Sequence, residues 1–334
     1  MIFFFVVATP LFAAFLYTFF RVREINRQIR PDGSFAEVGG ARLHYHFYRS
    51  DGSDPDAPVL VFLHGASGNA YDTRLAFLAS LKNKYDLLFI DRPGLGFSTG
   101  QGALHDLPEG QAHVLSLLLE RLEIDNAIVV GHSLAGSVTA ALGLCAPDRV
   151  KGLVFLAPVS HEWPGGVNWY YTVASWPVLG AIFCWTLTLP IGQGQAAKAL
   201  TNVFLPDGAP QGYPREMKLP LLFRPASFRA NARQIAFLKR AVISQSKRYS
   251  DIRQPALVVT GTHDTVVWPS IHCEGLIRDL PNAELLMLDL AGHMPHHTHT
   301  DVIIRGIQRL AKKVESTDNG THLAPKAEGS LDRV

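Results

Sequence analysis

Short runs of apolar residues without polar alternation recur along the chain, and longer segments with apolar positions every three or four residues lie between them. Unbroken apolar runs of about four to eight residues are typical of strands covered on both faces, and the periodic segments are typical of helices. The expected strands cover residues 59–63, 87–90, 127–130, 152–156, 256–260 and 284–288, and the expected helices cover residues 71–81, 108–122, 134–145 and 301–314.

This alternation of strands and helices predicts an α/β fold with a doubly wound, mostly parallel sheet. Residues 42–48 alternate polar and apolar side chains instead, as an antiparallel edge strand does. A crossover between neighbouring parallel strands needs only about a dozen residues, but a far longer stretch separates residues 152–156 from residues 256–260. The excess predicts a helical cap over residues 160–250, inserted into a core of residues 42–159 and 251–315.

The amino end is apolar, and residues 1–20 hold no charged side chain. A helix rises about 1.5 Å per residue, so this segment is long enough for a hydrocarbon core of about 30 Å. We interpret it as an uncleaved transmembrane anchor. A cleaved signal peptide and a buried helix are the alternatives, but the segment lacks a basic start and a small-x-small cleavage site.

Residues 21–41 form the expected linker, and its basic character predicts the orientation of the anchor. The cluster of Arg21, Arg23, Arg27 and Arg30 contains only Glu24 as an acid. Because basic residues stay on the cytoplasmic side of a membrane, the catalytic body is expected to be cytoplasmic on a single-pass anchor. At the other end, residues 316–334 are polar and aperiodic, which predicts a disordered tail.

Composition excludes several classes of protein. The formal net charge is +2 and charged residues make up 18%, which does not fit a bulk nucleic-acid binder, so no nucleic-acid partner is expected. The sequence indicates no particular protein partner. The three cysteines, Cys145, Cys184 and Cys273, are odd in number and lack C-x-x-C spacing, so they predict neither a disulfide framework nor a zinc site.

A candidate nucleophile follows the apolar run at residues 127–130. Gly131 ends the run, Ser133 comes two residues later, and small residues that can begin a helix follow. This is how a sharp strand-to-helix turn that exposes one hydroxyl is encoded. Ala135 stands where the second glycine of G-x-S-x-G usually stands, so this motif alone could also be a tight turn with a small serine.

A serine hydroxyl needs a base, and the base needs an acidic partner, to become a strong nucleophile. Asp264 follows the expected strand at 256–260, and His293 follows the next strand, which gives the chain order Ser, Asp, His. Upstream, residues 64–68 read His-Gly-Ala-Ser-Gly after a strand. The backbone N–H groups of Ala66 and Leu134 are therefore the candidate oxyanion hole.

Together these motifs resemble the α/β-hydrolase superfamily over residues 42–314. Five segments carry the resemblance: His64-Gly65, residues 91–98, residues 131–136, residues 261–264 and Gly292-His293. The resemblance implies an α/β-hydrolase fold with an eight-stranded sheet flanked by helices. The same motif set serves esterases, lipases, amidases, C–C hydrolases and cofactor-free haloperoxidases. Similar epoxide hydrolases and haloalkane dehalogenases use an aspartate as the nucleophile. The serine at position 133 therefore argues against these two activities.

Several of these residues have alternative roles. Asp91 is a rival for Asp264, but its Asp-Arg-Pro-Gly turn favours a structural ion pair or loop hydrogen bond. His132 precedes the nucleophile and is interpreted as a packed neighbour. His293, His296, His297 and His299 form a cluster that could suggest a metal, but no H-E-x-x-H motif or partnered cysteine is present, so we expect neither metal nor cofactor.

The cap has two unlike halves. Residues 163–197 hold no charged side chain and are rich in aromatic and aliphatic residues. This segment lies between two strands of one sheet, so a second membrane span is disfavoured. We expect it to line an apolar pocket for the acyl group. Residues 224–253 hold eight Lys or Arg and one acid, with apolar residues on one helical face. This is a solvated basic helix or one that lies on anionic headgroups.

These features predict a membrane-bound serine hydrolase that cleaves a lipophilic carboxylic ester, resembling an acylglycerol or a lysophospholipid, through an acyl-enzyme. A membrane lipid surface is the second expected partner. C–C bond hydrolysis or haloperoxidase-like chemistry on the same triad is one alternative. A binding module with an idle triad is another, although a binding module needs no acid, base and oxyanion loop together.

Overall fold

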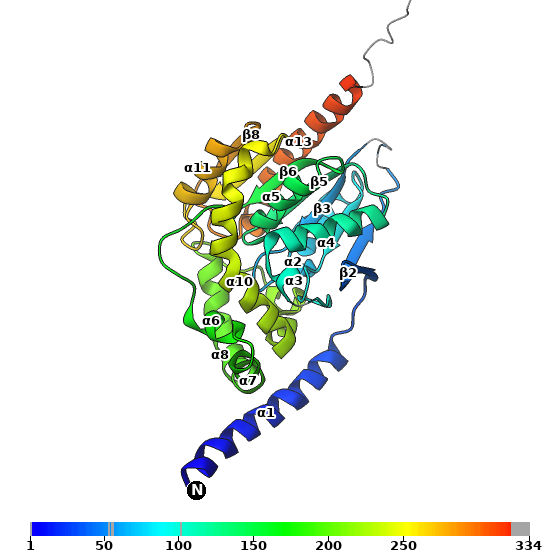
Figure 1. Cartoon of the computed structure of the whole chain (residues 1–334). Coiled ribbons are helices and arrows are strands. Elements are labelled where there is room, and N and C mark those ends of the chain that lie inside the picture. The colour runs from blue at the N-terminus through cyan, green and yellow to red at the C-terminus, as the bar shows by residue number, and fades with distance from the viewer. Residues whose placement is uncertain (1, 53, 55–56, 101, 322–334) are drawn as a thin grey trace, which may run out of the picture.

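The centre of the molecule is an eight-stranded sheet in the order β1-β2-β4-β3-β5-β6-β7-β8 (Figure 1). The structure is a computed structural model that describes all residues except 1, 53, 55–56, 101 and 322–334. The strands are β1 Ser34–Val38, β2 Ala41–Tyr48, β3 Val59–Leu63, β4 Leu87–Ile90, β5 Ala127–His132, β6 Val150–Leu156, β7 Ala256–Gly261 and β8 Ala283–Leu288. β2 pairs antiparallel with β1 and β4, and all other pairs are parallel. The predicted mostly parallel sheet is confirmed.

Helices cover both faces of the sheet because successive side chains of each buried strand point to opposite sides. In β3, Val61 and Leu63 pack into one core cluster, and Leu60 and Phe62 pack into the other. The first face is covered by α4 Pro108–Arg121, α5 Ala135–Cys145 and α11 Pro269–Asp279, and the second by α2 Ala70–Leu81 and α13 Thr300–Thr321. Two short helices, α3 Ala103–Asp106 and α12 Pro295–Thr298, complete the core.

The expected linker contains a strand. β1 lies within residues 21–41 and pairs with β2, with Ser34 opposite Tyr45 and Val38 opposite Ala41. The connection is Gly39-Gly40, and both glycines have positive φ angles of 54° and 74°, as a two-residue hairpin turn requires. β2 is therefore the second strand of the sheet and not its edge, which corrects the prediction for residues 42–48.

Helix α1 extends over Ile2–Gln28 and packs against the cap. Phe15 lies 5.4 Å from Trp185 between ring centroids, and Arg224 Nη1 donates to Asn26 Oδ1 at 3.3 Å. No helix in the described part of the chain is both long enough and apolar enough to cross a membrane, so the predicted transmembrane helix is not found there. The prediction falls partly on residues 1–8, whose side chains lie outside that part.

The predicted cap is helical. Its elements are α6 Trp169–Ser175, α7 Leu179–Thr186, α8 Thr188–Phe204, α9 Tyr213–Glu216, η1 Leu219–Phe223, α10 Pro225–Gln245 and η2 Ser246–Asp251. α10 runs back along the body (Figure 1), and Leu238 and Val242 are buried in the core beneath it. Its apolar face therefore packs on the protein, which removes the alternative that this face lies on a lipid surface.

The carboxyl end differs from the predicted tail at its start. α13 continues to Thr321, so residues 316–321 are helical. Residues 322–334, the remainder of the predicted tail, lie outside the described residues.

We predict that Gly131→Ala will destabilise the protein. A Cβ at Gly131 would lie 2.1 Å from Thr139 Oγ1 and 2.6 Å from the Ala135 carbonyl oxygen, so β5 and α5 would have to separate. The expected loss is about 1–3 kcal/mol of unfolding free energy, measured by urea denaturation. Gly194→Ala in α8 is the matched control. Nothing lies within 4 Å of its added Cβ, and the helix should gain up to about 1 kcal/mol. Equal stability of the two variants would contradict the prediction.

Candidate active site

Ser133 lies on the turn between β5 and α5. Its φ angle is 53°, in the left-handed region that non-glycine residues rarely adopt. Hydrogen bonds on both sides of the residue stabilise this conformation. The Ser133 N–H donates to the Leu156 carbonyl, and the Val159 N–H donates to the Ser133 carbonyl, each at 2.9 Å. Ala135 is fully buried against this turn, so the methyl group that replaces the usual glycine is accommodated.

The three residues predicted as a triad lie in hydrogen-bond contact. His293 Nε2 lies 3.0 Å from Ser133 Oγ, and His293 Nδ1 lies 2.8 Å from Asp264 Oδ2. With Nδ1–H donating to Asp264, the Nε2 lone pair faces the serine hydroxyl and can accept its proton. The other Asp264 oxygen accepts the N–H groups of Val266 and Val267 at 2.9 Å, which fixes the carboxylate.

The loop predicted to supply an oxyanion donor lies against the nucleophile. A Cβ on Gly65 would lie 3.1 Å from Ser133 Cβ. The cap holds this loop, since Ser67 N donates to Asn231 Oδ1 at 2.7 Å and Asn231 Nδ2 donates to Ser67 Oγ at 3.0 Å. The role of the Ala66 and Leu134 N–H groups as oxyanion donors stays a prediction.

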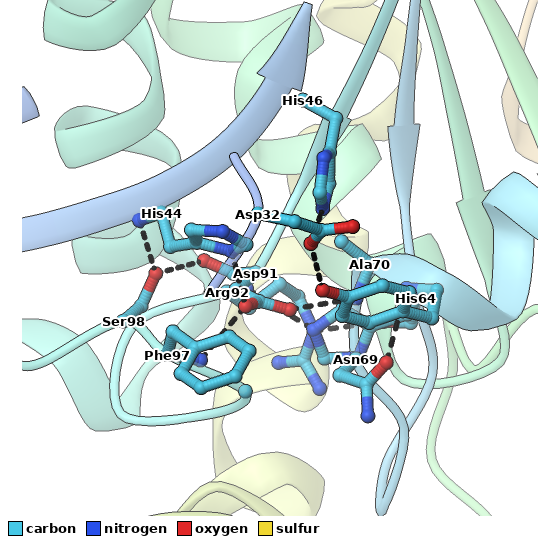
Figure 2. A network of polar contacts seen from close by, with 12 residues as sticks. Asp32, His44, His46, His64, Asn69, Ala70, Asp91, Arg92, Phe97 and Ser98 are labelled. Carbon is cyan, nitrogen blue, oxygen red and sulfur yellow. Dashed lines mark hydrogen bonds and ion pairs between the residues drawn. The ribbon is translucent and has the colours of Figure 1, made fainter. Parts of the chain in front are cut away.

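Asp91, the rival acid, belongs to a separate buried network (Figure 2). Its carboxylate pairs with His44 Nδ1 at 2.8 Å and accepts the N–H groups of Ala70 at 2.7 Å and Phe97 at 2.8 Å. Burial alone would raise the pKa of this carboxyl, but His44 and the Ala70 N–H outweigh burial and hold the pKa below its ordinary value. Gly96 has a φ of 53°, and a Cβ there would lie 2.1 Å from the Asp91 carboxylate.

Arg92 fixes the base of the oxyanion loop. Its side chain is fully buried and donates to the carbonyls of His64 at 2.8 Å and Gly65 at 3.0 Å. Two amide oxygens, Gln111 Oε1 and Gln234 Oε1, accept the remaining bonds at 2.9 and 2.7 Å. Burial without a carboxylate partner lowers the pKa of Arg92 to about 9, which still leaves the guanidinium charged at neutral pH. Residues 91 and 92 therefore act as structural supports.

The four histidines of the suggested metal cluster do not share one point. His293 contacts Ser133 and Asp264, and His299 Nδ1 pairs with Thr298 Oγ1 at 2.9 Å. Within the described residues, two other groups have ligand atoms within 4.8 Å of one another and could hold a metal. These groups are Asp72 with His132 and His296, and Asp32 with His44 and His46.

A second Ser–His–Asp set lies beside the cap. His161 Nδ1 lies 2.8 Å from Ser160 Oγ, and His161 Nε2 lies 3.0 Å from Asp279 Oδ2. Ser160 is fully buried, however, and its hydroxyl is 2.9 Å from the His272 carbonyl, to which it donates. This set is therefore a structural hydrogen-bond network, and Ser133 remains the candidate nucleophile.

Sequence reasoning missed Asn231, Asp72 and Tyr213. Asn231 lies in α10, and Tyr213 in α9 donates to Asp72 Oδ1 at 2.7 Å. In the sequence, Asp72 is an ordinary acid in the first turn of a helix, and the other two lie in the cap without any motif. Only the folded arrangement reveals their contact with the site.

The sheet order, the inserted cap and the Ser–His–Asp geometry are those of an α/β hydrolase. The model of the alpha/beta hydrolase family matches residues 60–305, and the chain belongs to this family. It is 24% identical over 285 residues to the uncharacterized hydrolase YugF of Bacillus subtilis, covering 82% of this chain and 96% of that protein.

Two further proteins illustrate the breadth of the family. The 2-hydroxy-6-oxononadienedioate/2-hydroxy-6-oxononatrienedioate hydrolase of Paraburkholderia phymatum is 27% identical over 278 residues, covering 79% of this chain and 89% of that protein. The crystal structure of a protein described as a membrane phospholipase A, a bacterial virulence factor, aligns with a TM-score of 0.66 at 20% identity and covers 94% of each chain.

The Asp91 network predicts a pH dependence of stability. Because the folded-state pKa of Asp91 is lowered, its stabilising contribution is present above the unfolded value of about 3.9 and is lost as the pH falls through the folded value. Asp91→Asn should cost about 2–4 kcal/mol at pH 7. Its unfolding free energy should also fall less than that of the wild type between about pH 5 and pH 3. The control is Asp148→Asn at an exposed acid, which should match the wild type. Parallel pH curves for the wild type and Asp91→Asn would contradict the prediction.

Proposed function

We propose that this α/β hydrolase cleaves a lipophilic carboxylic ester, acylglycerol- or lysophospholipid-like, through an acyl-enzyme on Ser133. The observation that carries the proposal is the continuous pair of contacts from Asp264 through His293 to Ser133, at 2.8 and 3.0 Å. A strained serine on a tight turn, with its base already within hydrogen-bond reach, fits a nucleophile.

In this mechanism, Ser133 Oγ attacks the ester carbonyl carbon while its proton passes to His293 Nε2. The carbonyl oxygen becomes an oxyanion that the Ala66 and Leu134 N–H groups stabilise. His293 then gives the proton to the departing alkoxide, which leaves as the alcohol. Water, deprotonated by His293, attacks the acyl-enzyme, and the acid leaves as the proton returns to Ser133. Asp264 stabilises the imidazolium throughout.

The cap residues that border the triad support an apolar acyl group. Met294, directly after the candidate base, packs with Phe204, Tyr213 and Met217 of the cap in one buried cluster. At the oxyanion loop, Tyr171 of α6 reaches Ser67 and packs on Phe228, with 6.1 Å between ring centroids. Apolar cap residues therefore flank both loops of the site, and an alkyl chain is the group that gains most from such surroundings.

We further propose that a membrane surface supplies the substrate, with the catalytic body on the cytoplasmic side. Large apolar side chains are exposed on α1, on α7 and its N-cap, which α1 contacts, and on α6, which packs against α7. The most exposed of them are Phe12, Phe20, Trp169, Val178 and Leu179, at 63, 62, 69, 71 and 55%. The arginines of residues 21–30 follow Phe20 directly in the chain and complement anionic headgroups. The similar structure described as a membrane phospholipase A favours the same setting.

Hydrolysis of a C–C bond is the second candidate, favoured by the similarity to the 2-hydroxy-6-oxononadienedioate hydrolase over 79% of this chain. Product analysis separates the two reactions. An ester yields an acid and an alcohol, whereas a C–C substrate yields an acid and a new C–H bond on the other product.

The first prediction concerns the triad. Ser133→Ala should lower kcat for p-nitrophenyl octanoate by at least about 10⁴-fold, and Asp264→Asn by about 10³–10⁴-fold, because the wrong histidine tautomer is favoured. Ser137→Ala is the matched control, since this buried serine donates only to the Leu134 carbonyl, at 2.7 Å.

In the wild type, kcat/KM should rise from acetate to octanoate by up to about fourfold for each buried methylene. Turnover that survives Ser133→Ala would contradict the mechanism, and a flat chain-length profile would contradict the substrate class.

The second prediction concerns the lipid surface. The purified protein should float with vesicles of phosphatidylglycerol and phosphatidylcholine, and more weakly at high salt. The double change Val178→Ser and Leu179→Ser should reduce the floated fraction several-fold, because it removes exposed apolar area. Leu104→Ser removes a leucine from α3 that is more exposed than Leu179, at 68% against 55%, and should have no effect. Equal flotation of all three proteins would refute the proposed surface.

A further inference from the structure

The carboxylate of Asp72 is a buried meeting point for three segments. Asp72 lies in the first turn of α2 and its side chain is almost inaccessible. Tyr213 of α9 donates its hydroxyl to Oδ1 at 2.7 Å. His297 Nε2 approaches the same oxygen at 2.8 Å, and His296 Nε2 approaches Oδ2 at 3.4 Å. One acid thus connects the core, the cap and the short helix α12 that follows His293.

The charge of this acid matches its donors. Burial would raise the pKa of Asp72, but the charges and hydrogen bonds of His296 and His297 outweigh burial, and the pKa lies well below its usual range. Burial lowers the pKa of His296. An ionised carboxylate accepts and never donates, so it suits a tyrosine hydroxyl and imidazole N–H groups.

The loop that carries His293 is confined between this acid and the cap. The His293 carbonyl lies 2.9 Å from His132 Nε2, whose N–H it accepts. A Cβ on Gly292 would lie 1.8 Å from the Leu205 carbonyl, so the cap backbone touches the loop directly. Beyond His293, the ring of His297 meets the ring of Tyr213 edge-on, with 5.0 Å between centroids, and lies tilted against Phe204 at 5.8 Å.

A second bond ties the same part of the cap to the same helix. Asn69, the N-cap residue of α2, donates from Nδ2 to the Met217 carbonyl at 2.7 Å. Residues 204–217 of the cap are therefore fastened to the start of α2 at Asn69 and Asp72. They cannot move away from the core without breaking contacts that also hold the loop of His293.

We propose that Asp72 is a positioning residue that joins cap residues 204–217 and the loop of His293 into one unit. The placement of the base and the binding of an acyl chain under the cap then both depend on this one carboxylate. This inference rests on the proposed function, because it assumes that His293 activates Ser133. Tyr213 supplies the connection to the cap, and His297 supplies the connection to the loop.

The test separates these two connections with two readouts. The first is the rate at which a small fluorophosphonate modifies Ser133, which needs the triad but no acyl pocket. The second is the pair of kcat and KM for p-nitrophenyl octanoate. The variants are Asp72→Asn, Tyr213→Phe, His297→Gln and His297→Phe. Tyr249→Phe is the control, because this buried tyrosine donates to the Ser160 carbonyl at 2.8 Å, in the separate buried network beside the cap.

Asp72→Asn is expected to slow fluorophosphonate modification by about 10²-fold, because a base displaced by about 1 Å loses that much. Tyr213→Phe should raise KM for the octanoate several-fold while the modification rate stays near the wild-type value. His297→Gln keeps an N–H near the position of Nε2 and should retain activity, whereas His297→Phe should resemble Asp72→Asn. Tyr249→Phe should change neither readout.

Three results would overturn the inference. The first is Asp72→Asn or His297→Phe reacting at the wild-type rate while folded, as judged by thermal unfolding. The second is a KM effect of Tyr213→Phe no larger than that of Tyr249→Phe. The third is stoichiometric zinc in the purified wild type that Asp72→Asn loses, since the carboxylate would then be a metal ligand. If Asp72→Asn does not fold, Tyr213→Phe and the two His297 variants decide. A wild type that fails to react with the fluorophosphonate refutes the proposed function instead.

Discussion

The left-handed backbone of Ser133 is the constraint on which the rest of the site depends. A φ angle of 53° places the serine on the turn between β5 and α5, and such strain persists only where the surroundings determine it. The surroundings here are the tight contact of Gly131 with Thr139 and the hydrogen bonds to Leu156 and Val159. Parallel strands then bring the loops after β7 and β8 to the same edge of the sheet, where Asp264 and His293 meet the serine.

Buried charges hold the loops that surround this turn. The Arg92 guanidinium donates to the carbonyls of His64 and Gly65, and Asp91 beside it accepts backbone N–H groups (Figure 2). In the first turn of α2, Asp72 accepts donors from the cap and from α12. Each of these groups is desolvated, so removing its partners is costly. The loops of the site are thus fixed by polar networks, while the sheet beneath them is held by apolar packing.

Much of the fold could be predicted from the sequence because buried parallel strands are written as unbroken apolar runs. The bounds of β3 and β4 match the runs themselves. β1 could not be recognised, since Ser34–Val38 is short, mixed in polarity and bordered by glycines that resemble a linker. Local motifs indicated Ser133, Asp264 and His293. Asp72 was beyond reach, because its partners Tyr213 and His297 lie 141 and 225 positions away and only the fold brings them together.

The account depends on a covalent intermediate at one serine, and mass spectrometry of the trapped intermediate tests this most directly. The wild-type protein is mixed with p-nitrophenyl octanoate, quenched with acid within the first turnovers and digested. We expect one peptide, the one that contains Ser133, to carry the mass of an octanoyl group. Acylation of another residue, or steady ester hydrolysis by the wild type with no acyl adduct, would contradict the account.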